Sequence, residues 1–377
     1  MLTYTLMNLI KSPWRSLQMI FGTYLVFVLL ISASSFQQSM ERSLAITGDE
    51  KNVILLGAGS EESLERSEVH LNAYSAAKTI YGLKQTFGKS AVSPEVHYNT
   101  LVNSGDKESE AMLRGITPTA IQVYPALGIE SGDFPQSGQV MVGRLAWKRL
   151  GFAEEDLQIG KTLTYEKQEF KISGIFTAPG TVMESEIWMN LNDLSAITQR
   201  DSLSCIVVRM EEAEYDDIDL FTKQRLDLQL SAIPETEYFK KLDSFYEPIK
   251  MMAWITALLI AAGALFGGLN TFYAAIKNRC KELATLQAIG YSRLRLFLSL
   301  YGESLFLHFI SFQAAVITAL YVFPGIHLNF GTTFFSLSIN QTLIMQIFGV
   351  CLLLALLVIL LPAWSCLRPP LNQVLKD

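Results

Sequence analysis

The segment from Gly82 to Ser90 is the closest approach to a chemical motif in this sequence, because it ends in Gly-Lys-Ser as a phosphate-binding loop does. That motif also needs a glycine five positions before its Gly-Lys-Ser, so that the turn directs backbone N–H groups at the phosphates. Position 83 is Leu83 instead. A helix that ends at Gly88, with a lysine after it, explains the string better. The sequence therefore predicts no nucleotide site here.

The other side chains that could do chemistry are the histidines and cysteines, and their spacing does not indicate a metal site. They are His70, His97, His308 and His327, together with Cys205, Cys280, Cys351 and Cys366. Cys205 is the only cysteine between residues 37 and 248, so no disulfide is expected within that part. No Ser/His/Asp set or carboxylate pair stands out. We therefore expect no catalytic residue, no metal site and no cofactor bound by this chain.

Charge divides the chain into two parts of different character. Its 377 residues are 50% hydrophobic and only 18% charged. Residues 37–248 hold 33 acids and 20 bases, a net charge of −13, whereas the remainder holds 3 acids and 10 bases, a net charge of +7. This difference in charge indicates an acidic, polar domain inserted into a membrane protein. The acidic surface argues against nucleic acid as a partner.

The apolar part is expected to form four membrane-spanning helices. Residues 16–40, 251–276 and 304–367 contain no Asp, Glu, Lys or Arg, and about 20 apolar residues span a bilayer. The third run is long enough for two helices, and Pro324, Gly325 and Asn340 interrupt it. Every basic cluster falls on one side of the membrane if both termini and the 277–295 loop are cytoplasmic. Residues 37–248 then lie outside.

The expected fold class is a membrane α-helical protein with four transmembrane helices and an α+β extracytoplasmic domain inserted between helices 1 and 2. The expected parts are a cytoplasmic interfacial helix (1–16), transmembrane helix 1 (17–37), the extracytoplasmic domain with a stalk (38–248), transmembrane helix 2 (249–276), a cytoplasmic helix (277–295), transmembrane helix 3 (296–323), a short external loop (324–341), transmembrane helix 4 (342–363) and a cytoplasmic tail (364–377).

Within the external domain, β-branched runs alternate with helical patterns between Gly and Pro residues. Predicted strands cover 52–56, 95–102, 110–115, 138–143, 161–165, 169–176, 186–190 and 203–210. Predicted helices cover 63–87, 144–150, 192–199, 214–230 and the stalk at 236–250, which runs into the second span, although Pro248 could break it.

The loop at 277–295 is the most informative segment. A short helix is expected to end at Gly290, and it exposes Leu283, Leu286 and Ile289 in otherwise basic surroundings. A helix with an apolar edge and a charged flank suits a groove on another protein. The same pattern suits a helix lying on the lipid surface. The residue types alone favour neither over the other.

The string from Asn278 to Gly290, NRCKELATLQAIG, resembles the coupling segment of permeases in the MacB/FtsX/LolC type of ABC transporter. Further resemblances are Asn270-Thr271 before it, Glu303-Ser304-Leu305 in the third helix, the N-terminal NLIKSPWRS, the C-terminal Pro362-Ala363-Trp364, and the external strings LQIGKTL, GIFTAPG and SEIW. The resemblance covers essentially the whole chain. It includes the layout of one helix, a large domain and three more helices.

Membership in that family implies a permease in the bacterial cytoplasmic (inner) membrane that transmits ATP-driven motion to its external domain. ATP and Mg²⁺ would be bound by a separate ATP-binding subunit, present in two copies. The other implied partners are a second permease copy, as a homodimer or a heterodimer with a paralogue, a periplasmic adaptor and the lipid bilayer.

The resemblance also implies roles for individual residues. Leu283, Leu286 and Ile289 would dock into the ATPase, Arg279 and Glu282 would make polar contacts with it, and Gly290 would form the turn. Glu303 is either a functional ionisable residue within the membrane or one that reaches the cytoplasmic interface.

The sequence is compatible with three functions. Export or efflux of a substrate from the external side is the first expectation. Extraction of lipoproteins or lipids from the outer leaflet is the second. The third is a regulator, without transport, of an external cell-wall enzyme.

Overall fold

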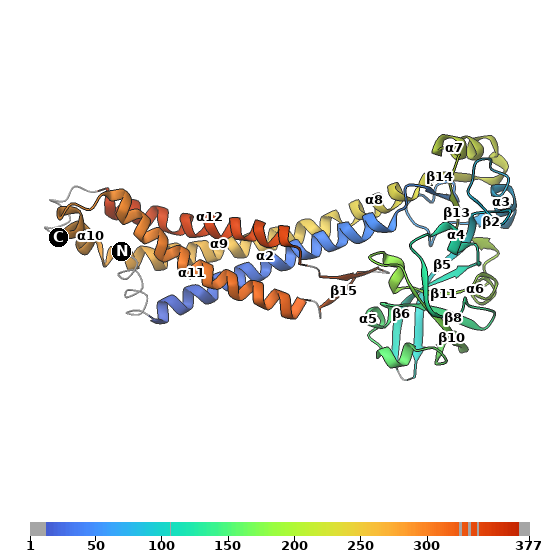
Figure 1. Ribbon diagram of the computed structural model, residues 1–377, viewed down its shortest axis with the longest axis horizontal. Helices are drawn as coiled ribbons and strands as arrows, with labels where there is room; N and C mark the ends of the chain where they lie inside the picture. The colour runs from blue at the N-terminus through green and yellow to red at the C-terminus, as the bar shows by residue number, and fades with distance from the viewer. Residues whose placement is uncertain (1–12, 106, 324–325, 331–332, 338, 369–377) are drawn as a thin grey trace. The chain divides into compact units, whose positions relative to one another are not determined.

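The structure is a computed structural model, and it describes the chain except for residues 1–12, 106, 324–325, 331–332, 338 and 369–377. The expected interfacial helix at 1–16 and the tail at 364–377 therefore lie mostly outside the described residues. The chain divides into two compact units (Figure 1). One comprises residues 1–38, 248–326 and 336–377, and the other comprises residues 39–247 and 327–335.

Among the residues that the structure describes, four helices are long and apolar enough to cross a membrane: α2 (Pro13–Thr47), α9 (Glu247–Lys277), α11 (Arg293–Val322) and α12 (Gln341–Leu367). Each overlaps one of the four predicted spans. The short helix α10 (Cys280–Ala288) lies between α9 and α11. The segment between α11 and α12 contains the hairpin of β15 (His327–Phe330) and β16 (Thr333–Ser336).

Polar side chains hold the long helices together inside an otherwise apolar interface. Thr23 of α2 donates to the Ser311 hydroxyl of α11 at 2.6 Å. The Ser304 hydroxyl of α11 donates to the carbonyl of Ala355 in α12 at 2.8 Å. The rings of Phe27 and Phe312 meet edge to face nearby. Helix α9 differs from its neighbours, because only 6% of its apolar 18-residue stretch is buried within the chain. The corresponding share for α2 is 56%.

The second unit is built on a mixed sheet of ten strands (Figure 1). Its order is β14-β1-β13-β5-β6-β11-β8-β10-β7, with β9 beside β10 and β5. The bounds are β1 (Asn52–Gly57), β5 (Val92–Ser104), β6 (Lys107–Ile116), β7 (Gly128–Gly132), β8 (Gln139–Gly143), β9 (Thr162–Tyr165), β10 (Gln168–Thr177), β11 (Ile187–Asn190), β13 (Cys205–Arg209) and β14 (Leu230–Pro234).

Short helices and small strand pairs complete this unit. The helices are α3 (Leu71–Ala77), α4 (Ala120–Val123), α5 (Ala146–Leu150), α6 (Leu191–Thr198), α7 (Tyr215–Gln224) and α8 (Glu235–Phe245), with 3₁₀ turns at Glu154–Leu157, Val182–Ser185 and Leu226–Leu228. The extra pairs are β2 (Val69–His70) with β12 (Ser202–Leu203), and β3 (Gln85–Thr86) with β4 (Lys89–Ser90). Apolar side chains of α3, α5, α6 and α7 pack with those of the strands in one core.

Two predicted elements differ from the structure. The helix predicted at 63–87 is wrong except for α3, because Gly82 adopts a positive φ and its carbonyl accepts three backbone N–H groups, from residues 211, 212 and 213. The helix predicted at 214–230 ends at Gln224, and the chain then forms the unpredicted strand β14 beside β1. Both errors arise where contacts distant in sequence decide the local structure.

The predicted stalk helix forms, but it is interrupted before the span. Helix α8 ends at Phe245 and α9 begins at Glu247. Pro248 lies in the first turn of α9. Backbone N–H groups in that turn make no hydrogen bond within the helix, so proline fits there without loss.

Candidate functional site

Helix α10 and the residues at its two ends include most of the residues that the sequence singled out. Arg279 is its N-cap residue, and the helix ends at Ala288. Gly290 follows with φ of 107°, a conformation that residues with a Cβ rarely adopt. The N–H of Tyr291 then donates to the carbonyl of Leu286 at 3.1 Å, which closes the end of the helix. Gly290 thus lies in the turn that follows α10.

The three apolar residues of α10 have different environments. Leu283 is only 2% exposed and packs in an apolar cluster with side chains of α9, α11 and α12. Leu286 is half-buried against the same cluster. Ile289, just after the helix, is 72% exposed. The expectation that all three are exposed is therefore wrong for Leu283, because its own chain already provides the apolar surface that covers it.

Arg279 and Glu303 form an ion pair. One guanidinium nitrogen, Nη1, lies 3.0 Å from Glu303 Oε2 and 3.3 Å from Oε1, and both side chains are largely buried. Glu282, in contrast, is exposed, with its carboxylate 4.0 Å from Arg279 Nε. Arg279 thus points toward α11, and Glu282 lies on the surface. The pairing was not evident from sequence, where the two residues of the pair are 24 positions apart.

Glu303 also borders a small cavity between α2, α9 and α11. Its lining includes Arg15 of α2, together with Thr271 and Phe272 of α9. Glu303 is therefore a buried carboxylate with a cationic partner and a polar border. Such a residue is costly to place in an apolar helix and is commonly functional.

A disulfide between Cys280 and Cys366 joins the start of α10 to the last turn of α12. The two residues are 86 positions apart, and their Cα atoms are 5.5 Å apart. Sequence spacing gave no indication of this pair. Together with Leu283 and the Arg279–Glu303 pair, it fastens α10 to both α11 and α12.

A second polar cluster lies inside the sheet of the external domain, and no motif in the sequence indicated it. Glu95 of β5 accepts hydrogen bonds from Arg114 at 3.0 Å and from the Tyr124 hydroxyl at 2.9 Å. Arg114 donates two more, each of 2.7 Å, to the carboxylate of Glu186. Trp188 donates to the same carboxylate at 2.8 Å.

The charges of this cluster stabilise one another. Burial alone would raise the pKa of Glu95, but Arg114 and His97 outweigh it and lower that pKa. Burial would likewise lower the pKa of Arg114, but Glu186 and Glu95 outweigh it and raise that pKa. Both residues therefore stay ionised in the interior.

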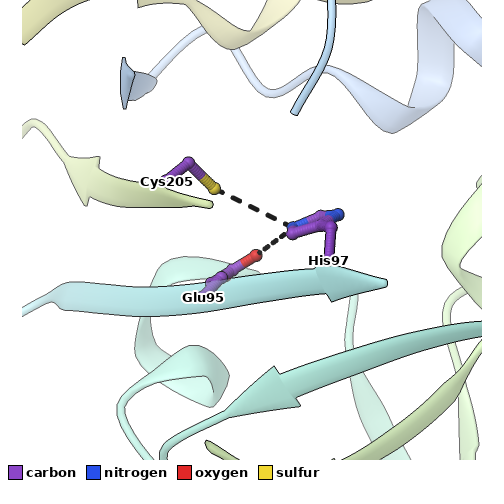
Figure 2. Close-up of side chains that lie close together, drawn as sticks. All are labelled: Glu95, His97 and Cys205. Carbon is purple, nitrogen blue, oxygen red and sulfur yellow. Dashed lines mark hydrogen bonds and ion pairs between the residues drawn. The ribbon is translucent and has the colours of Figure 1, made fainter. Parts of the chain in front are cut away.

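Beside this cluster, Glu95, His97 and Cys205 bring three potential metal donors together (Figure 2). Their donor atoms all lie within 4.8 Å of one another, and all three residues are buried. The only signal in the sequence is the Glu-x-His spacing, which puts two side chains on one face of a strand. The contribution of Cys205 depends on strand pairing, which the spacing along the chain does not give.

Comparisons with known families match both parts of the chain. The MacB-like periplasmic core domain matches residues 17–218, more than half of the chain. The FtsX-like permease C-terminal domain matches residues 254–373. A comparison with curated proteins finds no match.

Solved structures similar to this chain include two domains of transporter proteins. The periplasmic region of MacB from Actinobacillus actinomycetemcomitans is 13% identical, with a TM-score of 0.40, over 52% of this chain and 94% of that one. The extracellular domain of the noncanonic ABC-type transporter YknZ from Gram-positive bacteria is 15% identical, with a TM-score of 0.37, over 48% of this chain and 99% of that one. On the two family matches, which together span most of its length, the chain belongs to the MacB/FtsX-type permeases of ABC transporters.

Proposed function

We propose that this permease transmits ATP-driven motion from a cytoplasmic ATPase to its external domain, and that the motion serves export of a substrate from the external side. The ATPase is a separate subunit in two copies, and it binds ATP and Mg²⁺. The permease itself is not an enzyme. Its location is the bacterial inner membrane, with both termini cytoplasmic, the large domain outside between helices 1 and 2, and a periplasmic adaptor as a further partner.

The attachment of α10 is the observation that carries this proposal. A helix that passes on a displacement caused by a bound partner must be exposed on one side and firmly attached to its own chain on the other. The exposed side of α10 includes Glu282 and Ile289, and its attached side includes Leu283 and Arg279. A displacement of α10 is then passed to α11 through the Arg279–Glu303 pair. In this scheme Ile289 and Glu282 contact the ATPase, Leu286 contributes its exposed part, and Leu283 and Arg279 hold the helix in place.

The surface of α9 supports a second permease copy. Its exposed apolar residues include Met252, Leu258 and Phe266. Gly263 and Gly267 form a small-xxx-small pair, and a Cβ added at either would meet no atom within 4 Å. Such pairs let two spanning helices approach closely. We assign this face to a homodimer, and a paralogous permease would use the same face in a heterodimer.

Co-purification tests the proposed function. The tagged chain is expressed with ATP-binding subunits from its genome neighbourhood and purified in detergent. We expect a complex of two permeases and two ATPases. Ile289→Asp should abolish it, because a charge enters an apolar contact. Leu226→Asp is the matched control, since Leu226 is equally exposed but lies in the external domain.

Two outcomes would count against the proposal. A stable chain that binds none of the ATPases would overturn it. A normal yield of complex from Ile289→Asp would overturn the assignment of the docking surface.

A further inference from the structure

We propose that Glu95, His97 and Cys205 form a binding site for one divalent transition-metal ion of the zinc class, within the core of the external domain. The fold places these residues on one face of two paired strands. Glu95 and His97 are two residues apart on β5, so both side chains point to the same side. The antiparallel register pairs Cys205 of β13 directly with Glu95, which brings its thiol to that side as well (Figure 2).

The distances between the donor atoms suit a single ion. His97 Nε2 lies 3.0 Å from Glu95 Oε2 and 3.8 Å from Cys205 Sγ. Zinc binds nitrogen and oxygen at about 2.0–2.2 Å and sulfur at about 2.3 Å, so a tetrahedral site separates nitrogen from oxygen by about 3.3 Å and nitrogen from sulfur by about 3.6 Å. The observed separations differ from these by only a few tenths of an ångström, so small side-chain adjustments would accommodate the ion.

The surroundings of Glu95 resemble the outer shell of a metal site. Arg114 and Tyr124 hold its carboxylate in place, and Glu186 holds Arg114 in turn. Partners of this kind fix the orientation of a ligand. Glu95, Glu186 and Arg114 together carry one net negative charge. A cation offsets that charge and also the one added when the thiol ionises.

Thiolate, imidazole and carboxylate together favour zinc over magnesium or calcium, which prefer oxygen ligands alone. On binding, the ion replaces the hydrogen bond between His97 and Glu95. The imidazole proton resides on Nδ1, and the thiol proton leaves to solvent. The ion thus joins β5 to β13 and stabilises the folded domain, because the unfolded chain lacks the preformed site.

Cobalt provides a direct test, because a thiolate bound to Co²⁺ gives a charge-transfer absorption band. The chain has four cysteines, so Cys280→Ser, Cys351→Ser and Cys366→Ser together leave Cys205 as the only thiol. The full chain in detergent is stripped with a chelator, transferred to chelator-free buffer and titrated with Co²⁺. We expect the band to saturate at one ion per chain and to disappear when Zn²⁺ is added. Zn²⁺ should also raise the Tm, and chelator should reverse the rise.

The matched control adds Cys205→Ser to the same chain, a change of one atom, and should abolish the band completely. Absence of the band in the single-cysteine chain overturns the proposal, since the buried network is then held by hydrogen bonds alone. Persistence of the band without Cys205 also overturns it. If the chain with three serines does not fold, wild type and Cys205→Ser give the same comparison, with Cys351→Ser as the control for an unrelated buried thiol.

Discussion

Arg279 and Glu303 join the start of α10 to the interior of α11 through a buried ion pair with an N–O distance of 3.0 Å. Removing one partner of such a pair leaves the other charge uncompensated and costs about 3–5 kcal/mol. The pair therefore attaches α10 to α11. A substitution at Glu303 removes this ion pair without altering the exposed surface of α10.

Glu303→Gln should separate docking from transmission. The ATPase should still co-purify, because Ile289 and Glu282 are unchanged. Stimulation of ATP hydrolysis by the permease should fall several-fold, because the ion pair that passes a displacement of α10 to α11 is lost. The measurement is the ATPase rate of the purified complex, relative to the ATPase alone. The exchange Arg279→Glu with Glu303→Arg should restore part of the stimulation. Full stimulation by Glu303→Gln alone would contradict this role for the pair.

Leu283→Ala should lower stability, whereas Ile289→Ala should weaken ATPase binding. Truncating the buried Leu283 leaves a cavity, which typically costs about 2–5 kcal/mol, so the Tm of the detergent-purified chain should fall. Ile289 is mostly exposed, so its truncation should leave the Tm unchanged and weaken ATPase binding. Thermal melts and co-purification of both variants check this. The prediction fails if Leu283→Ala leaves the Tm unchanged.

The stability of the external domain should depend on pH through Glu235. Burial raises the pKa of Glu235 to about 7, although the Asp49 N–H and the Asn52 amide donate to its carboxylate. Arg209 bonds Asp49 and Asn52 beside it, and Glu95 and Arg114 also act on it. Because the folded-state pKa lies above the ordinary value of 4.5, its contribution to stability is fully present below pH 4.5 and is lost as the pH rises to about 7.

The expected loss is up to about 3 kcal/mol. Glu235→Gln should flatten the dependence of Tm on pH between 4.5 and 7, since an amide oxygen can accept both hydrogen bonds without a charge. The control is Glu237→Gln, on the same helix with a half-exposed carboxylate, which should leave the profile unchanged. An unaltered profile in Glu235→Gln would contradict the role of Glu235.

Gly267→Leu should weaken self-association of the permease. A leucine at this position in α9 prevents the close approach that a small-xxx-small pair allows. We expect the apparent dimer dissociation constant to rise about tenfold, equivalent to about 1.4 kcal/mol. Single-molecule photobleaching in liposomes measures the dimer fraction. Gly349→Leu in α12, where an added Cβ is equally unobstructed, serves as the control. An equal dimer fraction in both variants would place the interface elsewhere.

Much of the architecture could be predicted because it depends on local pattern. Runs without charge located the four long apolar helices, and alternating β-branched residues located most strands of the large sheet, including β1, β5 and β10. The fold around Gly82 could not be predicted, because residues 211–213 determine it from a distant part of the chain. The strand β14 was missed for the same reason, since its place depends on pairing with β1.

The candidate site was predictable as a segment but not in its orientation. The pattern of α10 indicated a helix with an apolar edge, and Gly290 indicated its end. The pattern did not show that Leu283 faces its own bundle while Ile289 faces outward. The pairing of Arg279 with Glu303, and the approach of Cys205 to Glu95, depend on packing and register that no spacing along the chain contains.

The fastening of α10 also has an entropic consequence. An isolated helix shorter than about 12–15 residues is marginal in water, and α10 has nine residues. The bundle maintains its helical form before any partner arrives, so association requires little further ordering of the chain. A free peptide of residues 279–290 would have to fold as it binds. It should therefore compete poorly with the intact permease, even though it carries every side chain of the contact.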